Sequence, residues 1–74
     1  MTFNETLLAA RTLLEHAGSS RWEFDFWWLA PSLEDFDGQS PAEFVGAGGS
    51  PEAVLAAARR RAELVYDRRA GSAE

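Results

Sequence analysis

Apolar residues near both ends of the chain recur every three or four positions, the spacing that gathers them on one side of an α-helix. This spacing predicts a helix from about Phe3 to His16, ended by Gly18, and another from about Pro51 to Arg68. The apolar side of each helix has to be covered by other parts of the protein. These apolar positions are Leu7, Leu8, Ala10, Leu14 and Ala17 in the first helix, and Val54, Leu55, Ala58, Ala62 and Val65 in the second.

The segment between Trp22 and Trp28 has a different pattern, in which large apolar residues alternate with polar ones over much of its length. Alternation with a period of two is typical of a β-strand. A strand needs a neighbour for its backbone N–H and C=O groups, and the chain has no second alternating run. A helix from about Arg21 to Leu29 is therefore favoured, with a strand as the alternative. The helix should end near Ala30, because the ring of Pro31 disfavours helical backbone in the residue before it.

Helix starts are marked by hydroxyl residues whose side chains can accept hydrogen bonds from unpaired backbone N–H groups. In a capping box, a Ser or Thr is followed three residues later by Glu, which accepts a bond in return. Three such pairs occur in the chain: Thr2 with Glu5, Ser20 with Glu23, and Ser40 with Glu43.

Two of the helix starts also carry proline at the first helical position, in Ser40-Pro41 and Ser50-Pro51. Proline suits that position because its missing N–H would be unpaired there. A short helix is therefore predicted from Pro41 to about Val45, followed by a glycine-rich connection. Residues 31–39 are predicted to form a loop with a turn of helix near residues 32–36 and a tight turn at Asp37-Gly38.

The predicted fold class is all-α, a small bundle of about four helices with a Pro/Gly-rich central loop. Residues 1–70 should form a single domain and residues 71–74 a flexible tail. A chain of 74 residues has room for only a small core, which the largest side chains should fill first. The predicted core aromatic and leucine residues of the central segment are Phe24, Trp28, Leu33, Phe36 and Phe44.

Composition narrows the functional classes. A net charge of −5 and the absence of Lys argue against DNA binding, which depends on cations that contact phosphates. The chain has no Cys and a single histidine, His16, so a structural zinc site is not expected. It also lacks a nucleophile motif and any apolar run near the roughly 20 residues that span a membrane. We therefore expect a cytoplasmic protein that is not an enzyme, with no catalytic residue, cofactor or metal.

The aromatic residues point to a binding surface. If residues 21–29 are helical, Phe24 and Trp28 share one side, and Trp22, Phe26 and Trp27 cannot all join them there. At least one large ring should then be exposed, and exposed Trp, like Arg, is common at the energetic centres of protein interfaces. The predicted partner-binding residues are Trp22, Trp27, Arg59 and Arg60. The run from Arg59 to Arg61 also has the alternative interpretation of a solvated helix face.

The central motif resembles a known family. The residues Trp28-Leu29, Pro31, Leu33, Gly38, Ser40-Pro41 and Glu43-Phe44, followed by a helix, are similar to the toxin-binding domain of Xre/MbcA/ParS-type antitoxins, over Trp27 to Val65. The resemblance implies a bacterial antitoxin that binds and silences a cognate toxin of the RES type. The segment before Trp22 is shorter than a helix-turn-helix domain, so promoter binding is not expected.

These observations lead to two hypotheses of different kinds. The first is a non-catalytic protein-binding module, antitoxin-like, that occludes a cognate toxin. The alternative is a small structural or adaptor protein, of the kind a phage encodes, that forms homo-oligomers through its exposed aromatic residues.

Overall fold

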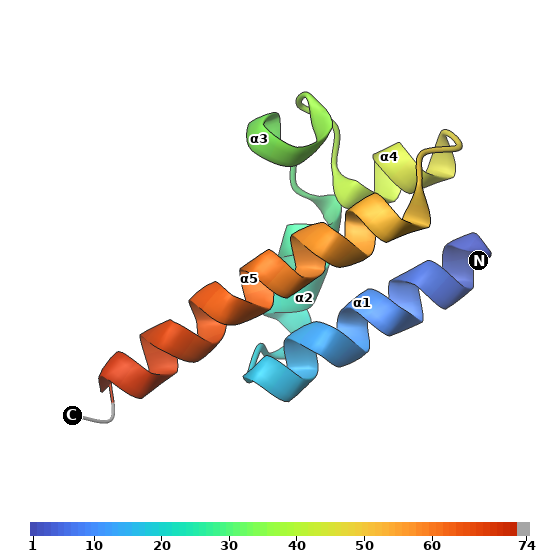
Figure 1. The fold of residues 1–74 in the computed structure, drawn as a ribbon. Helices are drawn as coiled ribbons and strands as arrows, with labels where there is room; N and C mark the ends of the chain where they lie inside the picture. Colours follow the sequence, from blue (N-terminus) through green and yellow to red (C-terminus); the bar gives the residue numbers. More distant parts are fainter. Residues whose placement is uncertain (73–74) are drawn as a thin grey trace.

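The computed structural model describes the backbone of residues 1–72 and side chains up to Arg68, and it is an all-α bundle (Figure 1). The helices are α1 (Phe3–Ala17), α2 (Arg21–Leu29), α3 (Leu33–Phe36), α4 (Pro41–Gly46) and α5 (Pro51–Ser72). Within residues 1–72 there is no strand, and a single isolated bridge joins Ser32 to Gln39. The predicted fold class and the helix over residues 21–29 are confirmed, and the strand alternative is wrong.

The helices begin at the positions that the hydroxyl residues predict. Both hydrogen bonds of the capping box are present at α1, α2 and α4. At α4, the Ser40 hydroxyl accepts from the Glu43 N–H at 3.0 Å, and the Glu43 carboxylate accepts from the Ser40 N–H at 3.1 Å. These bonds satisfy backbone donors that have no partner within the helix.

The end of α5 lies beyond its predicted position. We expected the helix to stop near Arg68, but it continues to Ser72. A glycine such as Gly71 costs a helix about 1 kcal/mol, which does not end it. Residues 73–74, at the end of the predicted tail, lie outside the described residues.

A compact corner joins α2 to α4. Ala30 leaves the helix in an extended conformation, and after α3 the chain turns back through Asp37 (φ 53°) and Gly38 (φ 90°). The Ser32 N–H then donates to the Gln39 carbonyl at 3.0 Å and closes the loop. The turn predicted at Asp37-Gly38 is thus confirmed, since both residues have the positive φ that glycine adopts freely and aspartate tolerates.

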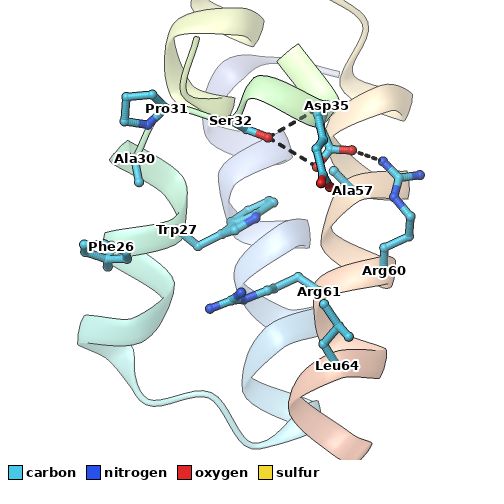
Figure 2. A pocket seen from close by; sticks show the side chains of 11 residues that line it. Phe26, Trp27, Ala30, Pro31, Ser32, Asp35, Ala57, Arg60, Arg61 and Leu64 are labelled. Carbon is cyan, nitrogen blue, oxygen red and sulfur yellow. Dashed lines mark hydrogen bonds and ion pairs between the residues drawn. The ribbon is translucent and has the colours of Figure 1, made fainter. Parts of the chain in front are cut away.

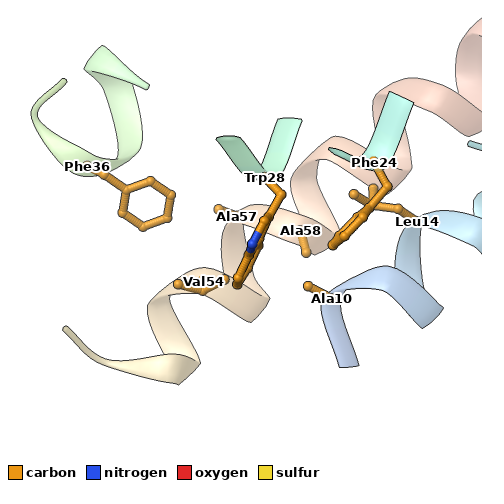
Figure 3. Close-up of a cluster of buried hydrophobic side chains, with 8 residues drawn as sticks. All are labelled: Ala10, Leu14, Phe24, Trp28, Phe36, Val54, Ala57 and Ala58. Atoms are coloured by element: carbon orange, nitrogen blue, oxygen red, sulfur yellow. The ribbon is translucent and has the colours of Figure 1, made fainter. Parts of the chain in front are cut away.

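The core lies where α2 crosses α1 and α5, which run beside each other in the same direction (Figure 1). Alanines on α1 and α5 let these helices approach closely, and the rings of Phe24 and Trp28 project onto them from α2 (Figure 3). The two rings stack with centroids 5.9 Å apart. The buried hydrophobic cluster comprises Ala10, Leu14, Phe24, Trp28, Phe36, Val54, Ala57 and Ala58.

Two leucines expected in the interior are exposed instead. Phe36 is buried and Phe44 packs on it with ring centroids 4.6 Å apart, but Leu33 is 83% exposed. Helix α3 is a single turn, so only one of its sides faces the core. Leu8 is 57% exposed because Thr6 and Ala10 occupy the buried side of α1, and a residue two positions from each is turned about 200° away.

Candidate protein-docking surface

Helix α2 carries large apolar side chains on both of its sides. Phe24 and Trp28 face the core, whereas Trp22 is 71% exposed and Phe26 and Leu29 are each 66% exposed. The exposed three follow one another at spacings of four and three residues, so they form one stripe, which we call the outer ridge. The prediction that at least one large aromatic residue remains uncovered is confirmed by Trp22 and Phe26.

Trp27 lies between the two sides of α2. It is half-buried, with its ring centroid 6.1 Å from that of Phe24 and 6.4 Å from that of Trp28. Its free surface lines an open groove of about 380 Å³ between α2 and α5 (Figure 2). We call this the α2–α5 groove; its walls include Phe26, Trp27, Ala30 and Pro31 on one side and Ala57, Arg60, Arg61 and Leu64 on the other, with Ser32, Glu34 and Asp35 at the α3 end.

Two ion pairs connect α5 to the elements opposite it. At the α3 end of the groove, Arg60 Nη2 lies 2.6 Å from Asp35 Oδ1. Towards the start of α2, Arg68 Nη2 lies 3.6 Å from Glu23 Oε2. Both arginine side chains are more than half exposed, so each pair adds little to stability. The Arg60–Asp35 pair joins two of the side chains that line the groove.

Arg61 lies on α5 between these two ion pairs. Its half-buried side chain extends from α5 towards α2, near Trp27 (Figure 2). Among the described side chains, no carboxylate forms an ion pair with Arg61. Its charge is still felt nearby: the pKa of Glu23 is lowered, first by the hydrogen bond from the Ser20 N–H, then by the Ser20 hydroxyl, and further by the charges of Arg68 and Arg61.

The structure divides the predicted partner-binding residues. Trp27 and Arg60 line the same groove, Trp22 belongs to the outer ridge, and Arg59 is exposed outside the groove. Arg61 and Leu64 also line the groove but were not among the predicted partner-binding residues. Helical spacing could have identified them. Arg61 and Leu64 lie four and seven positions after Ala57, which faces both the core and the groove, so all three share one side of α5.

The groove offers apolar surface and a guanidinium group. Among the residues that the structure describes, no cluster of three or more His, Cys, Asp or Glu side chains is arranged to hold a metal ion. Over the same part of the chain, none of the helices has the length and apolar character needed to cross a membrane.

Comparisons of the chain with protein-family models, with curated proteins and with solved structures found no match. The function of this surface has therefore to be inferred from its own residues.

Proposed function

We propose that this chain is a non-catalytic protein-binding module whose α2–α5 groove receives a segment of a partner protein. The observation that carries the proposal is Arg61, half-buried beside the Trp27 ring and without a carboxylate of its own among the described residues. A partner carboxylate would complete the pairing of Arg61, and an apolar side chain next to it would cover Trp27.

The residue types of the groove favour a protein as the ligand. Trp and Arg are enriched at the centres of protein interfaces, because a large ring and a planar guanidinium each contribute strongly once water is excluded. The guanidinium also forms two parallel hydrogen bonds with a carboxylate. The apolar surface continues from the groove through Phe26 and Pro31 onto the outer ridge, and this extent suits a protein partner better than a small molecule.

The proposed partner is a cognate toxin of the RES type, whose active site this module would occlude. The resemblance to antitoxin toxin-binding domains supports this choice, because it spans Trp27 to Val65. That range contains α3, α4 and groove residues from both walls, including Arg61 and Leu64. The carboxylate that would pair with Arg61 would then belong to the toxin.

Co-expression with the product of the adjacent gene tests the proposal. We expect this chain to co-purify with a tagged partner, with a mass that corresponds to a complex of the two. The Trp27→Ala substitution should weaken the complex by about 2 kcal/mol or more, and Arg61→Ala should weaken it by a similar amount. Arg11→Ala is the matched control, since Arg11 is a half-buried arginine on α1 that pairs with Glu15.

Two outcomes would count against the proposal. One is purification of this chain without the partner. The other is a Trp27→Ala variant that keeps full affinity but melts at a lower temperature, which would make Trp27 a core residue only.

A further inference from the structure

The outer ridge is apolar surface that the described residues leave uncovered. Trp22, Phe26 and Leu29 line a shallow, mostly apolar hollow together with Ala30 and Pro31, and within the described part of the chain Asp25 is the one charged residue in its lining. Contiguous exposed apolar surface of this kind marks an interaction site.

We propose that the outer ridge is the interface of a symmetric homodimer, in which α2 packs antiparallel against α2 of a second copy. In a two-fold interface every contact occurs twice: if residue i of one copy touches residue j of the other, then residue j of the first copy touches residue i of the second. A stripe centred on Phe26 meets this requirement, since Trp22 lies four residues before it and Ala30 four residues after it. Antiparallel pairing places the Trp22 ring of each copy on the hollow formed by Ala30 and Pro31 of the other, about 6 Å from the symmetry axis along the helix.

The charges near the two ends of α2 favour a second copy of the chain as the occupant of the outer ridge, and they favour the antiparallel arrangement. Arg21 begins α2, is exposed, and forms no ion pair with the described residues. The opposite end of α2 leads to the acidic turn α3, where Arg60 holds Asp35 while Glu34 is exposed and has no ion-pair partner in the described part of the chain. Antiparallel α2 helices bring Arg21 of each copy towards Glu34 of the other, whereas a parallel arrangement would place like charges together.

The first experiment measures the mass of the chain in solution by sedimentation equilibrium. We expect a monomer–dimer equilibrium, with a dissociation constant that Phe26→Asp raises at least 30-fold, about the effect of losing one central aromatic contact. Leu8→Asp is the matched control because Leu8 is a comparably exposed apolar residue on α1. Circular dichroism establishes that both variants keep their helices. A wild-type chain that is monomeric at about 1 mM, or a control that dissociates equally, would overturn the proposal.

The second experiment tests the antiparallel register by exchanging charges. Arg21→Glu and Glu34→Arg should each weaken self-association, because each places like charges together at both ends of the interface. Mixing the two single variants should yield mostly mixed dimers in native mass spectrometry, since both contacts then join opposite charges again. This preference should disappear at high salt, where exposed charges are screened. A statistical mixture of dimers at low salt would contradict the register.

The proposed dimer and the proposed partner share Phe26, Ala30 and Pro31, which line both the groove and the hollow, so each interaction has to be measured in the absence of the other. Trp27→Ala should leave self-association unchanged, because the Trp27 ring lies in the groove, on core residues Phe24 and Trp28. A chain that forms dimers but captures no partner would refute the proposed function alone, and a chain that captures its partner but stays monomeric without it would refute the dimer alone.

Discussion

The two sides of α2 are alike in chemistry and opposite in environment. Phe24 and Trp28 are 2% and 5% exposed, whereas Trp22 and Phe26, one turn away or less on the same helix, are largely exposed. Each pair consists of one Trp and one Phe, so hydrophobicity alone does not decide which pair is buried. The difference is that α1 and α5 cover only one side of α2.

The arrangement of the helices explains why the second side of α2 stays open. The two long helices, α1 and α5, both pack on the side of α2 that carries Phe24 and Trp28. The short helices α3 and α4 pack at one end of the bundle. A domain of this size buries a smaller fraction of its surface than a larger one does. Among the described residues, no helix therefore covers the outer ridge.

The largest effect should come from the inner side. Phe24→Ala removes a ring that is almost fully buried, and large-to-small changes of this kind cost about 3–5 kcal/mol. Because a small domain has little more stability than that, we expect the variant to be largely unfolded in water. Urea titration followed by circular dichroism measures the loss. A folded variant with near-normal stability would show that Phe24 does not anchor α2.

A smaller effect should follow from removing the cap that starts α2. In Ser20→Ala, the Glu23 N–H loses the hydroxyl that accepts its bond at 3.3 Å, which should cost about 1 kcal/mol. Ser20→Thr is the control, because it keeps an acceptor at the cap. Equal unfolding midpoints for the Ala and Thr variants would show that the hydroxyl contributes nothing to α2.

Phe26→Ala should change the stability of the monomer least among these substitutions. Its ring is mostly exposed, so the free energy of unfolding should shift by no more than about 0.5 kcal/mol. The measurement has to be made by urea titration at concentrations where the chain is monomeric, since self-association would add stability. A loss close to that of Phe24→Ala would mean that the two sides of α2 do not differ.

Acidification should have the mildest effect, at the beginning of α2. Because the pKa of the partly exposed Glu23 is lowered in the fold, chiefly by the Ser20 N–H, its ionised form stabilises the folded state. This contribution is complete above the ordinary value of 4.5 and is lost as the pH falls through the lower pKa of the folded state. Unfolding midpoints measured across this range should fall less steeply for Glu23→Gln. Some slope should remain, because Thr2 lowers the pKa of Glu5 in the same way.

The helix starts follow from residues that are neighbours in the chain. A capping box joins groups three residues apart, and proline and glycine act on the backbone where they stand, so these signals work before any helix packs on another. For this reason the starts of α1, α2, α4 and α5 were predicted correctly. Helical geometry alone also required an exposed ring on α2, because one side of a nine-residue helix cannot hold five large aromatic side chains.

Contacts between distant segments could not be predicted in this way. The Arg60–Asp35 pair joins residues 25 positions apart, and the α2–α5 groove exists only because α5 passes Trp27 at a particular distance. The prediction that Leu33 and Leu8 are buried was wrong for the same reason. Hydrophobic character is a property of each residue, but whether its side chain is buried depends on which helices pack beside it. Local backbone chemistry thus determines where each helix of this protein begins, and helix packing determines which of its apolar side chains remain available to another molecule.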